Sequence, residues 1–132
     1  MPILFDFYTS PSDPEKGEKE KYHARVVRSQ TVQIEDIVNH ISKRCTLSKG
    51  DIRAVLEELG DELVYNLCEG DRVCLPGIGY FYLSLSAPKD ANPQITRSQS
   101  IGIKAVEFRA DSILKTRLKH RARFERSDIK VH

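Results

Sequence analysis

Strand-like and helix-like patterns of apolar residues succeed one another along the chain. Residues 2–9 and 21–27 are rich in aromatic and β-branched side chains, and a polar segment with many turn-forming residues separates them. We therefore expect two strands that pair as a loose hairpin. Residues 34–44 and 49–68 instead place apolar side chains at helical spacing, which predicts two helices in a hairpin.

Local signals mark the ends of the second predicted helix. Ser48 and Asp51 have the spacing of a capping box, in which each side chain binds the backbone amide of the other residue. Gly70 follows the last apolar position, as a helix-terminating glycine does. The apolar stripe between them comprises Ile52, Val55, Leu56, Leu59, Leu63 and Leu67. So few elements leave this stripe uncovered, which favours an obligate dimer.

Alternation with a period of two returns after Gly70. Residues 73–75 and 80–86 predict strands, and the second places apolar and polar side chains on opposite faces. Residues 87–100 are polar and form a predicted arm. Residues 101–108 recover the strand pattern, with Val106 and Phe108 expected to face the core. Asp111 is predicted to cap a short helix, and the segment after it contains a further strand pattern, "RFERSDIKV", that is compatible with the N-terminal hairpin.

Charge is distributed unevenly. Residues 1–30 carry five basic and five acidic side chains, residues 31–86 carry five and nine, and residues 87–132 carry eleven and five. The net charges are therefore 0, −4 and +6. A basic C-terminal third is typical of a chain that meets a polyanion, although a solvated tail has the same composition.

Other features exclude several classes of protein. No apolar run approaches the roughly 20 residues of a membrane helix, and the N-terminus is not a signal peptide. The three cysteines form no C-x-x-C pair, so we expect small buried residues in a reducing cytoplasm. The histidines are scattered, and no catalytic or metal-ligating constellation is present. We therefore expect no enzymatic activity, no cofactor and no small-molecule substrate.

The order of elements and several motifs resemble the HU and integration host factor family of bacterial DNA-bending proteins. "GDRVCLPGIGYF" matches the family's glycine motif, "TLSKGDI" resembles its opening of the second helix, and "VEFRADSILK" resembles its closing helix. "NPQ" at residues 92–94 corresponds to the family's arm tip. The resemblance covers about residues 33–119, and residues 1–30 with the basic tail resemble a longer HU-like subgroup with extensions at both ends.

The resemblance implies an α+β, HU-like fold: a helical hairpin, a three-stranded antiparallel sheet with a protruding β-arm, and a short C-terminal helix, in an intertwined dimer. It divides the chain into an N-terminal extension (1–30), an HU-like domain (31–119) and a basic C-terminal extension (120–132). It implies non-sequence-specific binding and bending of duplex DNA through its phosphates and minor groove by a nucleoid-associated, cytoplasmic protein. A homodimer is expected, a heterodimer is compatible, and no membrane is involved.

Ten residues are carried over as DNA-binding candidates: Gly77, Gly79, Lys89, Asn92, Pro93, Gln94, Arg97, Lys104, Arg109 and Lys115. In the family the glycine turn lets backbone amides approach phosphate, but a hairpin turn that needs unusual dihedral angles would also require glycine. Pro93 is the candidate wedge between base steps, with an ordinary Asn-Pro turn as the alternative.

The arm departs from the family pattern because it is poor in arginine. Ser84, Ser86 and Lys89 stand at positions that include arginines in the family, and Asp90 adds a negative charge. Fewer phosphate contacts predict weaker binding by the arm. The tail compensates, or it is merely solvated; its basic residues are Arg117, Lys119, Arg121, Arg123, Arg126 and Lys130. The alternative function is an HU-fold assembly module with weak or no DNA binding.

Overall fold

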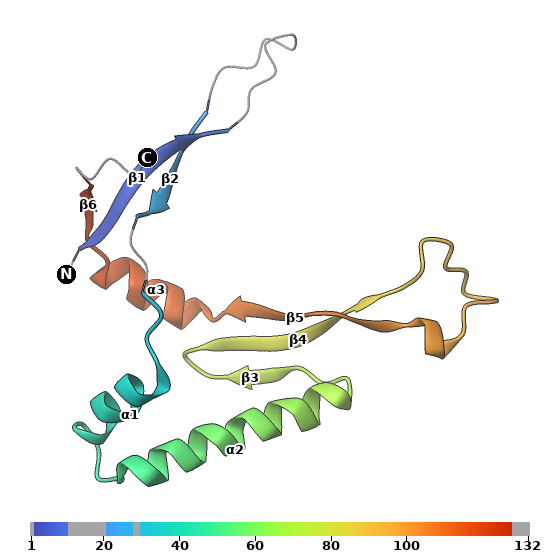
Figure 1. Ribbon diagram of the computed structural model, residues 1–132, viewed down its shortest axis with the longest axis horizontal. Coiled ribbons are helices and arrows are strands. Elements are labelled where there is room, and N and C mark those ends of the chain that lie inside the picture. Colours follow the sequence, from blue (N-terminus) through green and yellow to red (C-terminus); the bar gives the residue numbers. More distant parts are fainter. Residues whose placement is uncertain (1, 11–20, 28–29, 128–132) are drawn as a thin grey trace. The chain divides into compact units, whose positions relative to one another are not determined.

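The chain forms two compact units, each built around its own sheet. The computed structural model describes residues 2–10, 21–27 and 30–127, so Lys130 lies outside the described residues. The larger unit comprises residues 33–117, and the smaller one combines residues 1–32 with residues 118–132. Helix α3 (Ser112–Arg121) belongs to both, because its last turn counts with the smaller unit (Figure 1).

The larger unit begins with the predicted helical hairpin, α1 (Ile34–Ser42) and α2 (Lys49–Cys68). The capping box at the start of α2 is confirmed: Ser48 Oγ accepts the Asp51 amide at 3.1 Å, and Asp51 Oδ2 accepts the Ser48 amide at 3.4 Å. Gly70 has a φ of +83°, the left-handed conformation in which a helix commonly ends. Both ends of α2 are therefore fixed by the local sequence.

An antiparallel sheet in the order β3-β4-β5 packs against α2. Its strands are β3 (Val73–Leu75), β4 (Gly79–Ser86) and β5 (Gly102–Ala110). Phe81 faces Phe108 across β4 and β5, with ring centroids 5.1 Å apart. We call the face of the sheet that carries these two rings the inner face, and the opposite one the outer face.

A β-bulge interrupts the β4–β5 pairing, and the sequence pattern did not predict it. Ser84 pairs with Ala105, whereas Leu85 pairs with Ile103, so Lys104 has no partner on β4. The extra residue shifts the alternation of β5 by one position. Leu85 and Ile103 therefore stay on the inner face, and this face remains apolar toward the arm.

The larger unit buries little of its apolar surface within one chain. Among the described residues, the buried hydrophobic side chains are Val38, Ile52 and Leu67. Val106 and Phe108, expected in the core, are 59% and 49% exposed, because none of the described elements covers that part of the inner face. Other large apolar side chains on α2 and on the β4–β5 hairpin are also exposed: Val55, Val64, Tyr65, Leu85 and Ile103.

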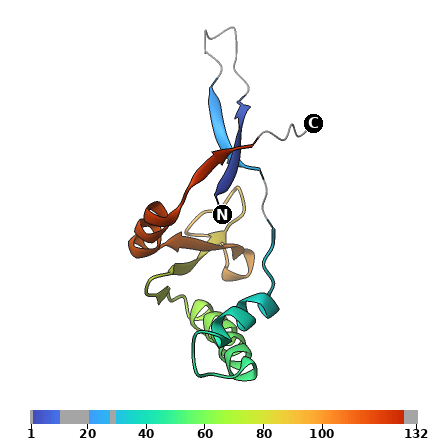
Figure 2. The same ribbon diagram turned by 90° about the vertical axis from the view of Figure 1, so that its left-hand side faces the viewer.

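The smaller unit holds a three-stranded sheet in the order β2-β1-β6. Strands β1 (Ile3–Thr9) and β2 (Tyr22–Val26) pair antiparallel, and β6 (Phe124–Arg126) pairs parallel to β1 (Figure 2). Asp6 and Arg25 face each other and form an ion pair of 2.7 Å. The predicted hairpin is thus confirmed, and so is an extra strand within "RFERSDIKV", although residues 128–131 of that segment lie outside the described residues.

The expectation that the cysteines are buried is wrong for this structure. Cys45, Cys68 and Cys74 are all free and exposed. Cys45 lies in the connection between the two helices, and Cys68 is in the last turn of α2. Cys74 pairs with Tyr80 on β4, and both side chains are on the outer face. The low polarity of cysteine is therefore not sufficient to predict that these side chains are buried.

Gly79 provides a test of packing between β4 and β5. A Cβ atom there would lie 2.6 Å from a ring carbon of Phe108 and in collision with the carbonyl oxygen of Arg109. We expect Gly79→Ala to destabilise the protein by roughly 1–3 kcal/mol or more. Gly60→Ala is the matched control, because nothing lies within 4 Å of its added Cβ in α2, and it should stabilise by roughly 0.5–1 kcal/mol. Urea denaturation at one protein concentration measures both, and equal stabilities would contradict the packing role.

Candidate functional site

The outer face of the sheet in the larger unit gathers aromatic and basic side chains. Tyr80 and Tyr82 alternate with inner-face residues along β4, and Tyr80 is paired with Arg109 of β5. Arg72, directly before β3, places its guanidinium carbon 5.1 Å from the ring centroid of Tyr82, which is cation–π distance. The fold thus brings side chains of the β3–β4 hairpin together with Arg109 of β5, which is distant from them in sequence.

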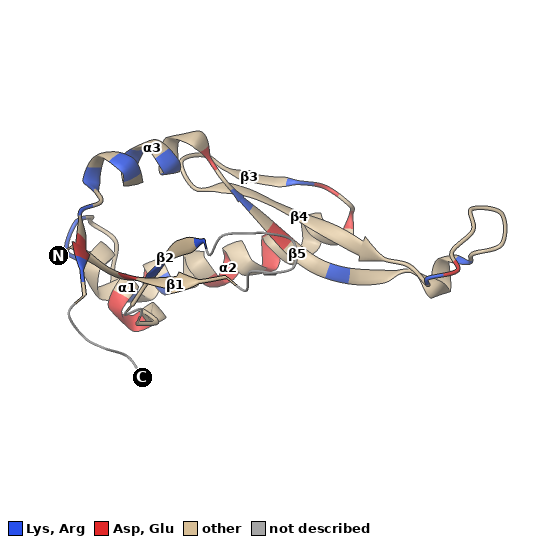
Figure 3. Ribbon diagram, turned by 90° about the horizontal axis from the view of Figure 1, so that it is seen from above, with Lys and Arg blue, Asp and Glu red and all other residues tan. Residues whose placement is uncertain are grey.

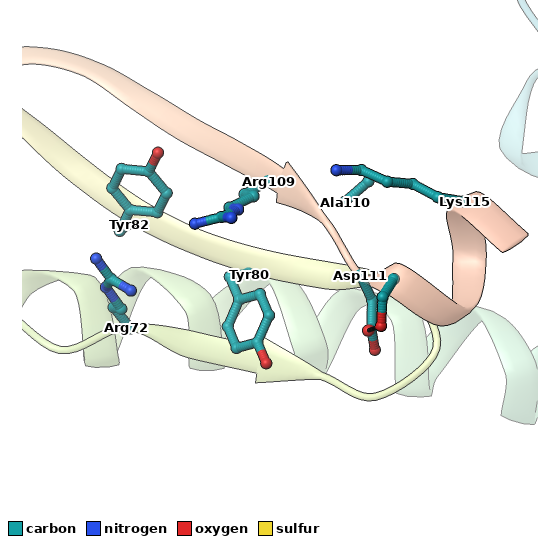
Figure 4. Close-up of a pocket in the computed structure, with 8 residues that line it drawn as sticks. Arg72, Tyr80, Tyr82, Arg109, Ala110, Asp111 and Lys115 are labelled. Atoms are coloured by element: carbon teal, nitrogen blue, oxygen red, sulfur yellow. Dashed lines mark hydrogen bonds between the residues drawn. The ribbon is translucent and has the colours of Figure 1, made fainter.

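These side chains line a pocket of about 470 Å³ at the junction of the sheet with α3 (Figure 4). Arg72, Arg109 and Lys115 supply three positive charges, and Asp111 supplies one negative charge. The remaining lining residues are Tyr80, Tyr82, Ala110 and Ser112. The pocket therefore combines net positive charge with phenolic hydroxyl groups, a combination that suits an anionic ligand.

Asp111 uses its carboxylate within the protein. Asp111 Oδ2 accepts the amide of Gly77 at 2.9 Å, while Oδ1 accepts the amide of Ile113 at 3.3 Å in the first turn of α3. These bonds to the Gly77 and Ile113 amides hold the pKa of Asp111 below its ordinary value. The backbone amide of Asp111 also donates to the Ile78 carbonyl at 3.0 Å. One residue therefore caps α3 and fixes the β3–β4 turn.

The structure requires glycine at two positions of that turn, for two different reasons. Gly77 has a φ of +79°, which side-chain-bearing residues rarely adopt, and its amide is bound to Asp111. Gly79 is buried and leaves no space for a Cβ atom beneath Phe108. The hairpin-turn interpretation accounts for both glycines, and contact of either with phosphate stays a prediction.

The arm brings a second group of the candidate residues together at its tip. Asn92, Pro93 and Arg97 line a hollow of about 590 Å³ with neighbouring arm residues. Lys89 and Gln94 are exposed in the same segment, and a short 3₁₀ helix follows at Ser98–Ser100. Lys104, at the bulge, lies between this tip and the pocket that contains Arg109 and Lys115. The ten candidates thus divide among turn, pocket, bulge and arm tip.

An acidic residue interrupts the outer face between the pocket and the bulge. Glu107 is paired with Tyr82, and its Oε1 accepts a hydrogen bond from Ser84 Oγ at 3.0 Å. The hydrogen bond holds a negative charge next to Arg109, two residues further along β5. This carboxylate lowers the positive potential of the outer face, an effect that the net charge of the segment did not reveal.

Sequence reasoning missed Arg72, Tyr80 and Tyr82 as parts of the site. A signal for the tyrosines was present, since the alternation of β4 already placed them on the polar face. Arg72 gave no such signal, because it belongs to the segment of net charge −4. Only the register of β3, β4 and β5 brings it to Arg109.

Neither metal nor membrane chemistry is indicated by the described part of the chain. Its His, Cys, Asp and Glu side chains form no group of three or more that could hold a metal ion. No helix in the described ranges combines the length and the apolar character that crossing a bilayer requires.

A helical hairpin packed on a three-stranded antiparallel sheet with a long β4–β5 arm defines an HU-like α+β domain. The chain belongs to the HU-HIG family, described as an HU domain fused to wHTH, Ig, or glycine-rich motif, whose model matches residues 1–126. The resemblance to HU proteins seen in the sequence is thereby confirmed. No match is found among curated proteins.

Two solved structures are similar to the chain. A Bacteroides vulgatus protein, named a "Putative bacterial DNA binding protein", aligns with 94% of this chain at 12% identity and a TM-score of 0.65. The chain spans about half of that protein, 48% of its length. An Anabaena HU–DNA cocrystal structure aligns with 68% of this chain and 98% of that one, at 19% identity and a TM-score of 0.48. At 12% identity, the similarity to the Bacteroides vulgatus structure shows a shared fold alone.

Asp111→Asn tests the role of the carboxylate through pH. The pKa of Asp111 in the folded protein is lower than its ordinary value of 3.8. The ionised carboxylate therefore stabilises the fold at pH values above 3.8, and this contribution is lost as the pH falls through the lowered pKa. We expect the variant to have a lower Tm than the wild type at pH 7, and the difference to shrink on acidification below about pH 4. Asp61→Asn, at an exposed position of α2, is the control. A Tm difference independent of pH would contradict the assignment.

Proposed function

We propose that the protein binds duplex DNA along the outer face of the sheet and the arm, with little sequence preference, and bends it. The pocket formed by Arg72, Arg109 and Lys115 is the observation that carries the proposal. Membership of the HU-HIG family and the name of the similar Bacteroides vulgatus structure, a bacterial DNA binding protein, support it. A nucleoid-associated, cytoplasmic location follows from this proposal.

The chemistry of the pocket matches the DNA backbone better than base edges. Arginine and lysine neutralise phosphates, and tyrosine hydroxyls donate hydrogen bonds to phosphate oxygens. Basic positions continue along β5 and α3 (Figure 3), and they include Lys104, Arg109, Lys115 and Arg117. Contacts of this kind fix the position of the duplex but carry little sequence information.

Bending requires the arm in addition to the pocket. Pro93 at the arm tip is a rigid apolar group that fits between base steps, and the deformation it causes lets more of the protein surface meet the duplex. Arg97 shares the hollow with Pro93 and supplies a phosphate contact beside it. We assign Lys89, Asn92 and Gln94 to the same arm–DNA contact. Phosphate contacts of Gly77 and Gly79 belong to the proposal as well, and a contact at Gly77 would share an amide that already donates to Asp111.

The protein acts as a dimer in this proposal. Val106 and Phe108 expose an apolar inner face, and Val64 and Tyr65 of α2 are each 64% exposed. We expect light scattering at micromolar concentration to give twice the 15.1 kDa of one chain. Val106→Glu on the inner face should abolish the dimer, whereas Lys104→Glu at the bulge should preserve it. A stable folded wild-type monomer would contradict the proposal.

The salt dependence of DNA binding tests the electrostatic part of the proposal. The logarithm of the binding constant should fall linearly with the logarithm of the salt concentration, with a slope that reflects several released counterions. Arg109→Ala should weaken binding and reduce the slope by about one contact. Arg44→Ala, in the connection between α1 and α2, removes the same charge away from the outer face and should leave the slope unchanged. The measurement is a fluorescence anisotropy titration of a labelled duplex.

A second candidate function is a protein-assembly module with weak or no DNA binding, which Glu107 on the outer face favours. The same titration separates the two candidates. If DNA lies along this face, Glu107→Gln should raise the affinity, because it removes a negative charge that repels phosphate. A wild-type slope near zero, with no effect of Glu107→Gln, would favour the assembly module.

A further inference from the structure

The arm tip is closed by hydrogen bonds that all involve Asn92. The Asn92 carbonyl accepts the amides of Ile95 at 3.1 Å and Thr96 at 2.8 Å, and Thr96 Oγ1 accepts the Asn92 amide at 2.7 Å. Asn92 Oδ1 also accepts the amide of Gln94 at 3.0 Å. The tip is therefore an ordered turn in which the directions of residues 93–95 are fixed relative to the arm.

This turn exposes an isoleucine. Ile95 is 74% exposed, the largest value among the exposed large hydrophobic side chains of the described residues. Its sequence neighbours Gln94 and Thr96 are polar, and both are held by Asn92. Pro93, two residues earlier, instead lines the hollow beside Arg97 and Ile101. Among the large apolar side chains that the structure describes, Ile95 is thus the most exposed to solvent.

We propose that Ile95 is an apolar wedge that inserts between base steps of the bound duplex, in addition to Pro93. The proposal rests on the DNA bending proposed above. Isoleucine is among the side chains that proteins use to unstack base steps. Branching at Cβ limits its rotamers, and the turn fixes its backbone, so insertion orders few additional degrees of freedom. The free energy of insertion then comes from burying apolar surface instead of from charge.

The pair Ile95→Val and Ile95→Thr tests this role, since valine and threonine have nearly the same shape and differ by a hydroxyl. Ile95→Val should retain the bend, measured by fluorescence energy transfer between the ends of a short labelled duplex. Ile95→Thr should reduce the bend and weaken binding roughly fivefold or more, because a hydroxyl would be buried without a partner. The salt slope should stay the same in both variants, because no charge changes.

A nicked duplex is the internal control. It is already deformable, so less unstacking remains to be supplied, and Ile95→Thr should lose less affinity for it than for intact duplex. Equal losses on both substrates, or a threonine variant that binds and bends like the wild type, would overturn the role of Ile95 and leave the proposed function standing. Failure of the wild-type protein to bind either duplex would instead contradict the proposed function itself.

Discussion

The bond between the Asp111 carboxylate and the Gly77 amide fixes the geometry on which the pocket depends. Gly77 belongs to the β3–β4 turn, and Asp111 lies between β5 and α3, so one interaction of 2.9 Å joins the turn to the neighbouring end of β5. Arg109 precedes Asp111 by two residues and Lys115 follows it by one helical turn. The pairing of β4 with β5 places Arg109 beside Tyr80, and the bonds of Asp111 hold the start of α3 so that Lys115 lines the same pocket.

Close packing of backbone against side chain explains why the glycine turn has its sequence. Gly79 lets β5 approach β4 so closely that the Phe108 ring lies over it, and Gly77 makes the left-handed bend that aims its amide at Asp111. These requirements arise within the domain and do not involve a ligand. In this chain the glycine motif is therefore explained by the fold alone. The argument for DNA binding depends instead on the charged side chains around it.

The sequence predicted most elements because their signals are local. Ser48 with Asp51 and Gly70 define α2 through hydrogen bonds within a few residues, and the alternation of β4 depends only on neighbouring positions. The candidate site was predicted less completely because it is a product of register. Arg72 reaches the pocket through the pairing of β3 with β4, and the bulge at Lys104 decides which side chains of β5 share a face. The bulge has no local signal in the chain, and the glycine turn between β3 and β4 does not by itself show that Arg72 comes near Arg109.

Charge and apolar surface have different roles along the β4–β5 hairpin. At its base, three cations surround two tyrosines, but Glu107 offsets part of their charge, so electrostatic attraction is concentrated where the sheet meets α3. Toward the tip the cations become sparse, and the ordered turn around Asn92 displays Pro93 and Ile95 instead. In the proposed function, attraction that is strongest at the base would hold a duplex near the sheet through its phosphates, which carry no sequence information. Burial of apolar surface at the tip is independent of salt and is available only where base steps open. If the proposed function holds, the two contributions together would favour DNA that bends easily over DNA of a particular sequence.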